Sequence, residues 1–373
     1  MGRAVIFINF LFAGLIFNAC ADDETPTLPG DLEHIAYDPR PYDLVIPEGF
    51  PPMSIPEDNP LTVDGVQLGH FLFYDPILSK DSSMSCSSCH LPEGSFTDNL
   101  ALSPGVDGLE GKRSAMSLIN AGFYTNGFFW DGRSATLEHQ ALQPVENPVE
   151  LNTQWETVEG RLRKHTDYPA RFRKAFGIAD SKEISRDLAV KAIAQFERTL
   201  ISSGTSKYDR KFLNHEIGID FSEEEFRGYD LFFDTPGSPL PDGQCFHCHN
   251  APLFTINQYF NNGLQEAATL NDFPDPGRGA VTGKQIDNGK MRAPTLRNIM
   301  LTAPYMHDGR FQTIEEVLDF YNEGLHYADN LDDNLVIPLG LTPQMKLDII
   351  AFLHTLTDTA FVNNPQFSNP FDP

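Results

Sequence analysis

Apolar residues recur at helical spacing in several separate stretches of the chain. Between Asp64 and Tyr74 they follow the period of an α-helix, and Asp75-Pro76 then supplies a natural stop. The clearest amphipathic pattern runs over residues 183–200, where one stripe is formed by Leu188, Ala192, Phe196 and Leu200. Both stretches are predicted to be helices with one buried face.

Local start signals mark further helices in the second half. Ser222 and Thr313 each stand three residues before a glutamate, which forms a capping box, and Thr342-Pro343 places proline at a first helical position. Together with shorter periodic stretches, these signals predict helices over 135–142, 154–164, 222–233, 313–322 and 344–356. Alternation typical of strands is scarce, so we expect a mainly α fold with few or no strands.

The length of 373 residues suggests two domains of ordinary size, each able to bury its own core. The polar loop 202–207 is the best boundary between them. A helix followed by a similar cysteine motif occurs in both halves, which suggests a duplicated module. We therefore expect a first domain at 61–203, a second at 204–360 and a tail at 361–373.

The first 19 residues have the pattern of an export signal. Arg3 precedes an apolar run that is too short for a membrane span, and Ala19 stands directly before Cys20. This arrangement predicts a signal peptide at 1–19 and lipoprotein processing with a lipid anchor at Cys20; secretory cleavage without a lipid is the alternative. Residues 20–60, acidic at first and then rich in proline, are expected to form a solvated tether in the periplasm.

Two short motifs carry most of the chemistry. Each contains two cysteines separated by two residues and followed by a histidine: Cys86, Cys89 and His90, then Cys245, Cys248 and His249. The spacing lets both thiols form thioethers with one haem while the histidine binds its iron. A zinc or redox motif is the alternative, but two chance copies among only five cysteines would be a rare coincidence. The sequence therefore predicts two covalently bound haem c groups.

A formal net charge of −25 narrows the choice of partners. So acidic a chain is a poor ligand for nucleic acid, whereas a basic redox protein would be attracted to it. An excess of acidic residues also keeps many exported proteins soluble. The net charge therefore argues against nucleic acid as a partner but does not identify the redox partner.

The sixth ligand of each haem iron decides between electron transfer and catalysis. Two strong protein ligands on both irons make an electron carrier, whereas an open face makes an enzyme. In the first half no histidine lies between His90 and His139, and Met116 is the only methionine from Cys89 to Trp130. We interpret Met116 as a packing residue, so the first haem is expected to have an open face.

With these features the chain resembles the family of bacterial di-haem cytochrome c peroxidases and MauG proteins. The resemblance covers residues 60–357 and rests on the two haem motifs and, in order, on segments 68–79, 108–113, 129–133, 137–151 and 293–311. Each segment alone is a modest signal, but their order is highly specific. The resemblance implies two cytochrome c-like domains and chemistry with hydrogen peroxide.

By position, the resemblance assigns the peroxide reaction to the first haem, above His90. Glu150 matches the family's distal acid–base, which moves a proton from one peroxide oxygen to the other. Gln140 matches the polar residue beside it, and Trp130 matches the tryptophan that relays electrons between the haems. Without the resemblance, Glu150 would be interpreted as a solvated carboxylate and Trp130 as a core residue.

The second haem would then receive electrons, and its sixth ligand departs from the peroxidase pattern. Tyr321 stands where the peroxidases have a methionine, and it is similar to the axial tyrosine of MauG. A tyrosinate is a hard anionic donor, which stabilises ferric iron and lowers the reduction potential. The rival ligands are Met291, Met306 and His326, and a tyrosine packed on the apolar face of its helix is the simplest alternative.

A second departure lies in the loop after the first motif. Peroxidases that need reductive activation carry a histidine in this loop, which caps the open haem until the other haem is reduced. Here the corresponding stretch contains Gly105-Val106 and no histidine. We therefore expect a first haem that is open at rest and needs no activation.

The resemblance also implies a calcium ion between the domains. Thr302 and Pro304 match its carbonyl donors, and Ser114 stands where the family has a side-chain amide. A serine hydroxyl can still offer an oxygen to a hard cation. His307 and Arg292 match residues near the haems, where a propionate contact or a structural hydrogen bond is the simpler role.

The leading hypothesis is a di-haem peroxidase that reduces hydrogen peroxide to water with electrons from a small cytochrome c or cupredoxin. A MauG-like oxidase, which uses peroxide equivalents to oxidise a protein substrate at long range, is the alternative, and Tyr321 favours it. A second alternative is a plain electron-transfer cytochrome, which would need two strong protein ligands on both irons. A homodimer is left open.

Overall fold

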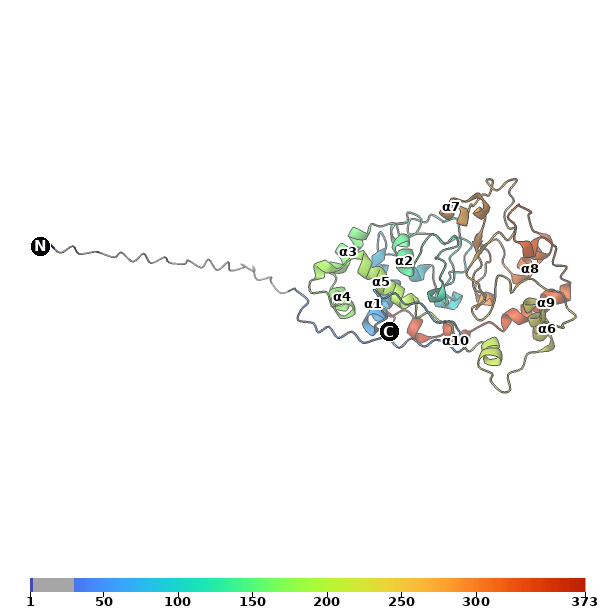
Figure 1. Cartoon of the computed structure of the whole chain (residues 1–373), viewed down its shortest axis with the longest axis horizontal. Helices are drawn as coiled ribbons and strands as arrows, with labels where there is room; N and C mark the ends of the chain where they lie inside the picture. Colours follow the sequence, from blue (N-terminus) through green and yellow to red (C-terminus); the bar gives the residue numbers. More distant parts are fainter. Residues whose placement is uncertain (3–29, 373) are drawn as a thin grey trace.

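The computed structural model describes residues 1–2 and 30–372. In Figure 1, α1 to α5 gather at one end of the molecule, while α6, α8 and α9 gather at the other. The predicted signal peptide at 1–19 and the predicted lipid attachment at Cys20 lie outside the described residues. Within the described part of the chain, every helix is too short or too polar to cross a bilayer.

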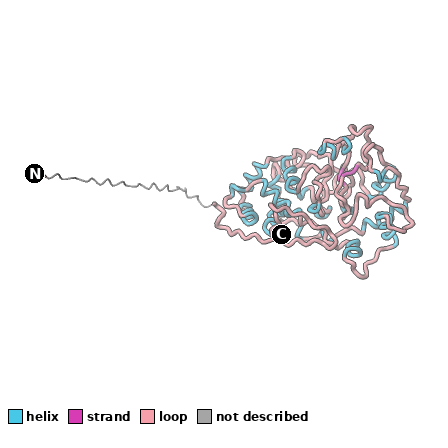
Figure 2. The backbone as a smooth tube through the Cα atoms, viewed as in Figure 1, coloured by secondary structure: helices cyan, strands magenta, loops and turns pink. Residues whose placement is uncertain are grey.

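Helices joined by long loops make up the fold (Figure 2). Helices of the first half are α1 (Val63–Tyr74), α2 (Leu137–Glu146), α3 (Trp155–Lys164), α4 (Tyr168–Phe176) and α5 (Arg186–Glu197). Helices of the second half are α6 (Glu223–Phe233), α7 (Arg278–Thr282), α8 (Ile314–Glu323), α9 (Pro343–His354) and α10 (Thr359–Val362). The sheet of the described residues pairs β1 (Tyr259–Phe260) antiparallel with β2 (Met291–Arg292). The expected mainly α fold is confirmed.

The predicted capping boxes start two of these helices. At α6 the Ser222 hydroxyl accepts a hydrogen bond from the Glu225 amide, and the Glu225 carboxylate accepts one from the Ser222 amide. Thr313 opens α8 in the same way. Helix α4 is absent from the sequence prediction. It begins after Asp167 with proline in its first turn, but the Asp167 side chain forms no capping hydrogen bond.

A close helix crossing supports each half. In the first half α1 packs on α5, where a Cβ at Gly69 would collide with the Ala192 carbonyl oxygen. In the second half α6 packs on α9, where a Cβ at Gly228 would collide with the Asp348 carbonyl oxygen. The same kind of contact, made by the helix that precedes each cysteine motif, supports the predicted duplication.

Each half buries its own apolar core. The largest core of the first half includes Leu68, Leu72, Trp155, Val158, Phe172 and Ile193. The core of the second half includes Phe232, Phe254, Ile349, Phe352 and Leu356. Each half thus has an apolar core of its own, while the division into two domains and its boundary stay predictions.

Both ends of segment 30–372 contact the body. Leu32 is 6% exposed and donates its amide to the Ala179 carbonyl at 3.0 Å, and the Phe50 ring contacts the Phe123 ring. At the other end Phe361 and Phe367 are buried in a cluster of the first half. Leu32 and Phe50 thus attach segment 30–60 to the body at separate points, while most of its residues are exposed. The expected solvated tether over 20–60 stays a prediction.

A buried ion pair fixes the loop after the second cysteine motif. Arg297 and Asp209 are both fully buried and form two hydrogen bonds of 2.9 and 2.8 Å. The Arg297 Nε–H also donates to the Pro252 carbonyl at 2.7 Å. Because removal of either charge would leave the other buried without a partner, the pair strongly specifies the position of this loop.

One buried carboxyl of α5 lacks such compensation. Glu197 is 5% exposed, and its Oε2 atom has no hydrogen-bond partner among the described residues. Burial raises the pKa of Glu197 to about 8, because the Arg198 charge only partly opposes the loss of solvation and the Glu138 charge adds to it. The folded protein therefore keeps this proton at pH values where an unfolded chain releases it.

We predict that this carboxyl makes the folded state less stable as pH rises from about 5 to 8. In that interval the folded state binds more protons than the unfolded state, so the free energy of unfolding falls by at most about 1.4 kcal/mol per pH unit from this group. Glu197→Gln should flatten the slope, as measured by urea unfolding of the holoprotein at several pH values. Glu323→Gln, on the exposed end of α8, is the control. An unchanged slope in Glu197→Gln would contradict the assignment.

Candidate haem centres

The first cysteine motif lies on a tight turn that directs its histidine inward. Residues 86–88 form a short 3-10 helix, and the His90 amide donates to the Cys86 carbonyl at 3.1 Å. The His90 Nδ1–H donates to the Phe96 carbonyl at 2.8 Å. Because this bond uses Nδ1, the lone pair of Nε2 is free for a metal.

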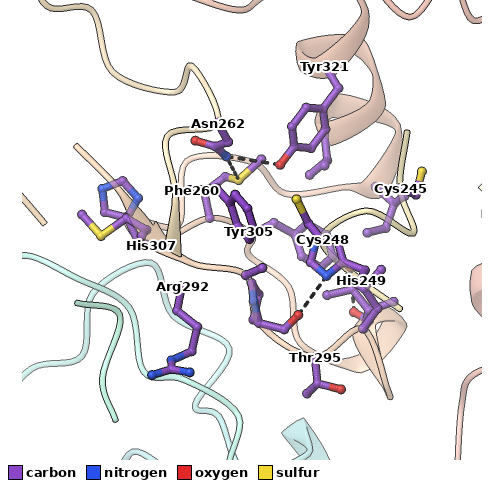
Figure 3. Close-up of a pocket in the computed structure, with 18 of the residues that line it drawn as sticks. Cys245, Cys248, His249, Phe260, Asn262, Arg292, Thr295, Tyr305, His307 and Tyr321 are labelled. Atoms are coloured by element: carbon purple, nitrogen blue, oxygen red, sulfur yellow. Dashed lines mark hydrogen bonds between the residues drawn. The ribbon is translucent and has the colours of Figure 1, made fainter. Parts of the chain in front are cut away.

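The second motif repeats this geometry. The His249 amide donates to the Cys245 carbonyl at 3.0 Å. The Nδ1 atom of His249 lies 3.0 Å from the Pro294 carbonyl oxygen and 3.3 Å from that of Phe254 (Figure 3). Burial lowers the pKa of His249 to about 4, so the imidazole is neutral at pH 7, as an iron ligand requires.

Both loops place a phenylalanine carbonyl under the imidazole by a left-handed backbone. Phe96 has a φ of 64° and Phe254 a φ of 52°. Such values are uncommon for a bulky residue and persist only where the surroundings enforce them. The two histidines thus occupy equivalent positions in a repeated local structure.

A large cavity adjoins the second motif. Its volume is about 1720 Å³, including the part open to solvent, and its walls carry both thiols of the motif and His249. Many of the other lining side chains are apolar, among them Phe232, Leu296, Ile314, Leu318, Ile349 and Leu353. An apolar pocket with a few placed polar groups is typical of a cofactor site.

Tyr321 enters this cavity from α8. Its hydroxyl accepts a hydrogen bond of 3.2 Å from the Asn262 side chain (Figure 3), and burial raises its pKa to about 12. Two of the rival ligands, Met291 and Met306, also line the cavity, whereas His326 is not among the described lining residues. The structure therefore brings Tyr321 to the same cavity as His249 without excluding either methionine.

A buried cation at the cavity wall lacks an anionic partner. Arg292 is 2% exposed, and no carboxylate of the described residues lies within ion-pair distance of it. Its guanidinium donates instead to neutral oxygens, which belong to Asn126, Gly127, Phe129, Asn257 and Tyr259. A buried positive charge without a counter-ion fits a site that receives an acidic ligand.

These features together fit a covalently bound haem c. The thiols can form its two thioethers, the free Nε2 atoms can bind its iron, and Arg292 can pair with a propionate. At the first motif the backbone makes the same turn, since the amides of Cys89 and His90 both donate to the Cys86 carbonyl. The residues of both motifs therefore suit the cofactor.

Glu150 stands near the first motif. It follows α2 on a loop where the Asn147 side chain donates to its carboxylate at 2.6 Å. Burial raises the pKa of Glu150, with the Asn147 hydrogen bond and the Arg133 charge opposing the shift. The next residue, Leu151, accepts a hydrogen bond from the Lys80 amide at 2.8 Å and belongs to the apolar core against which Cys86 packs. Burial raises the pKa of the Cys89 thiol to about 11, and the charges of Asp98 and Glu150 add to this shift.

The loop with Gly105-Val106 packs directly on the Glu150 segment. The Val106 amide donates to the Glu150 carbonyl at 2.8 Å, and a Cβ at Gly105 would collide with the Val149 carbonyl oxygen. Asp107 adds two further contacts to this loop: its carboxylate pairs with Lys80 at 2.8 Å and accepts a hydrogen bond from the Asn152 side chain. The loop is therefore held against the Glu150 backbone.

The other predicted residues take up the following positions. Gln140 lies on α2, partly exposed, and Trp130 lines the second cavity, where its indole N–H donates to the Ser114 carbonyl at 3.0 Å. The predicted calcium donors, Ser114, Thr302 and Pro304, also line this cavity. His307 is 6% exposed, and its ring contacts that of Trp130.

Sequence reasoning missed two buried groups beside these sites. Glu197 lies close to Cys86. Burial is the main reason that the pKa of the Cys86 thiol is raised, and the charge of Glu197 is the second. Asn298, which is 0% exposed, forms hydrogen bonds to both halves of the chain. Neither residue belongs to a motif, and only the folded structure brings each to its partners.

Comparisons with known proteins agree on one family. The model of the di-haem cytochrome c peroxidase family matches residues 63–216. A cytochrome-c peroxidase of Denitromonas iodatirespirans is 35% identical over 87% of this chain and 90% of its own length. The methylamine utilization protein MauG of Methylorubrum extorquens is 33% identical over 83% of both chains. A solved MauG-like protein associated with microbial copper homeostasis is 34% identical, with a TM-score of 0.78 over 88% of this chain and 99% of its own.

Proposed function

The chain belongs to the family of di-haem cytochrome c peroxidases and MauG proteins, and on this premise we propose how its two haem sites divide the reaction. It is a peroxidase with two covalently bound haem c groups. One observation carries the proposed division: Tyr321 lines the cavity beside His249, whereas Glu150 stands near the thiols of the first motif. The first site therefore receives peroxide and the second handles electrons.

In the proposed reaction, one hydrogen peroxide, two electrons and two protons yield two water molecules. When bound, the first haem supplies the iron at which the oxygen–oxygen bond is broken. Glu150 accepts the proton of one peroxide oxygen and donates it to the other, which leaves as water. Gln140 donates its amide N–H to the peroxide and holds it for this transfer. The raised pKa of Glu150 makes its carboxyl an effective proton donor.

Electrons are proposed to enter at the second haem and to pass through Trp130. This residue lines the second cavity, and its carbonyl accepts the Arg292 amide at 2.8 Å. The chain continues from Trp130 into α2, which carries Gln140. Trp130 therefore lies between the second cavity and the helix that serves the first site. The donor is a small cytochrome c or cupredoxin, with a basic surface that suits the acidic chain.

The first haem is proposed to be open to peroxide in the resting, oxidised protein. Gly105 and Val106 replace the loop histidine that caps the iron in other peroxidases. Their loop is held on the Glu150 backbone by the Val106 amide, and Asp107 ties it to Lys80 and Asn152. The exposed ion pair alone contributes little, but the backbone hydrogen bond and the close glycine contact add to it. A loop fixed in this way has no capping group to release.

Oxidation of a protein substrate is the second candidate function. The observation in its favour is Tyr321, which lines the cavity where peroxidases of the methionine type would place their ligand. A tyrosine oxygen lowers the reduction potential of its iron, so the second haem becomes a poorer electron acceptor and a better store of oxidising power. The solved MauG-like relative at 34% identity is compatible with this candidate.

We also propose the cellular setting and a calcium site. The mature protein is placed in the periplasm, tethered by a lipid at Cys20, and a homodimer remains one possible assembly. Ser114, Thr302 and Pro304 would hold a calcium ion beside the second cavity. The Ser114 hydroxyl donates to the Met306 carbonyl at 3.1 Å, which leaves its oxygen lone pairs for a hard cation.

Replacing Glu150 tests the peroxidase mechanism. Glu150→Gln should lower kcat/KM for hydrogen peroxide by about 100-fold or more, because it removes the proton acceptor and donor. Stopped-flow spectroscopy with a reduced small cytochrome measures the rate. Glu146→Gln, exposed at the end of α2, is the matched control and should retain wild-type rates.

The pH dependence provides a second arm of that test. In the wild type the rate should fall as pH drops through the raised pKa of Glu150, since the protonated carboxyl cannot accept the peroxide proton. The acidic limb should be absent in Glu150→Gln. Equal rates and equal pH profiles in the two proteins would rule out Glu150 as the acid–base.

The resting spin states test the proposed readiness. The fully oxidised holoprotein should show one high-spin and one low-spin ferric signal by electron paramagnetic resonance, because only the first site lacks a strong sixth ligand. Cyanide should convert the high-spin signal alone, and peroxide should react without prior reduction. Two low-spin signals at rest, both unchanged by cyanide, would instead support an electron-transfer cytochrome.

Substitution of Tyr321 tests the second site. Tyr321→Met should raise the reduction potential of the second haem and change its low-spin signal, because a thioether replaces an anionic oxygen. Potentiometric titration followed by absorption measures the shift. Tyr305→Phe is the control, since Tyr305 also lines the cavity but its hydroxyl donates to the Ile299 carbonyl at 3.1 Å. A potential that is unaffected by Tyr321→Met would leave Met291 or Met306 as the ligand.

A further inference from the structure

Two asparagines occupy equivalent positions in the two halves. Asn120 and Asn298 are 1% and 0% exposed, and their φ angles are 60° and 59°. Each directly precedes a short 3-10 helix, at 121–123 and 299–301. Asparagine tolerates the left-handed conformation better than most residues, so both positions suit it.

Both asparagines use the same atoms to hold the end of their own half. The Asn120 amide donates to the Leu200 carbonyl at 2.8 Å, and its Oδ1 accepts from the Ser202 amide at 3.0 Å. The Asn298 amide donates to the Leu356 carbonyl at 3.2 Å, and its Oδ1 accepts from the Asp358 amide at 2.6 Å. These bonds join each asparagine to the residues that follow α5 and α9.

The side-chain NH2 groups differ between the two copies. Asn120 donates from Nδ2 to the Ser202 hydroxyl at 3.2 Å, within its own half. Asn298 donates from Nδ2 to the Ser95 hydroxyl at 3.1 Å, in the other half. Ser95 is 0% exposed, so this bond between the halves is shielded from water.

The hydrogen bond between Asn298 and Ser95 joins the second half to the loop that orients His90. Ser95 directly precedes Phe96, whose carbonyl accepts the His90 Nδ1–H. Phe96 also packs on Phe361, with ring centroids 5.7 Å apart, and the Asp358 carboxylate caps the helix of Phe361. A change at Asn298 therefore reaches Phe96 both through Ser95 and through Asp358.

The same asparagine is rigidly joined to the second histidine. Pro294, four residues before Asn298, accepts a hydrogen bond from His249. Between them the Thr295 hydroxyl donates to the Leu253 carbonyl at 2.6 Å, and the Leu296 amide donates to the Phe254 carbonyl at 3.1 Å. Segment 294–298 is thus fixed to the loop that follows the second motif.

We propose that Asn298 is a positioning residue that couples the histidine loops of the two haem sites. Through Ser95 it sets the carbonyl that orients His90, and through segment 294–298 it moves with the carbonyl that orients His249. A change in the orientation of either histidine would then change the orientation of the other. The proposal rests on two haem sites and not on peroxide turnover, so a protein without peroxidase activity would still test it.

The experiment compares the two asparagines in the holoprotein. Asn298→Gly and Asn120→Gly remove the side chains while glycine keeps the left-handed backbone. Redox potentiometry and electron paramagnetic resonance report on each haem separately. We expect Asn298→Gly to change the equilibrium constant for reduction of the first haem by about two- to fivefold, the effect of losing part or all of one buried hydrogen bond. Asn120→Gly should leave the second haem unchanged.

A double substitution identifies the bond that carries the effect. Ser95→Ala should reproduce the shift of the first haem, and Ser95→Ala with Asn298→Gly should add little beyond either change, because both remove the same interaction. If Asn298→Gly does not assemble with haem, Asn298→Asp keeps the shape and the accepting oxygen but lacks the donor, and should shift the first haem likewise. The proposal is overturned if substitutions at Asn298 alter only the second haem, or if the effects are additive.

Discussion

Each histidine of the two cysteine motifs must present Nε2 to an iron, and a hydrogen bond from Nδ1 to a carbonyl enforces this. For His90 the carbonyl belongs to Phe96, and for His249 the carbonyls belong to Pro294 and Phe254. A neutral imidazole carries one proton, so a proton held on Nδ1 leaves the Nε2 lone pair for the metal. To bring the carbonyl under the ring, both phenylalanines adopt a left-handed backbone. The packing around each loop holds this strained turn in place.

The two halves of the chain provide that support with the same parts. In each half a glycine on the helix before the motif allows close contact with a later helix, and a left-handed asparagine holds the residues that follow it. The copies diverge where chemistry differs. Glu150 follows α2 near the first motif, whereas Tyr321 lies on α8 in the second cavity. A common scaffold therefore places different side chains near its two histidines, as the proposed division of roles between the haem sites requires.

Much of this architecture could be predicted because its signals are local. The helices with clear periodicity or capping residues, such as α5, α6 and α8, form close to where the sequence places them. The haem motifs are equally local, since five consecutive residues contain the whole attachment signal. Helix α4 was not predicted, although Asp167 and Pro169 at its start and Gly177 at its end are signals that the sequence contains. The resemblance to a known family led to Tyr321, and the structure brings this residue to the cavity of His249.

Contacts between distant segments could not be predicted in this way. Asn298 and Ser95 are 203 residues apart in the chain, and nothing in either local sequence points to the other. Asn120 follows Leu118-Ile119 and Asn298 follows Leu296-Arg297, but this short similarity carries no information on the different directions of the two side-chain amides. The packing of residues 30–60 and of Phe361 depends likewise on surfaces formed only by the folded chain.

These distant contacts join the two cores, as the proposed transfer of electrons between the haem sites requires. Electrons passing between two haems depend on the distance and orientation of the groups between them, which a hinge at the loop 202–207 would leave undefined. The chain avoids this by crossing between the halves repeatedly. Arg297, paired with the buried Asp209, packs on Phe50 of the N-terminal segment, and Phe361 returns from the second half to the core of the first. These contacts between the halves are buried. Relative movement of the halves would therefore expose apolar surface or leave a buried charge without its partner, and both raise the free energy. The distance and orientation between the two cysteine motifs thus depend on the same buried contacts that stabilise the fold.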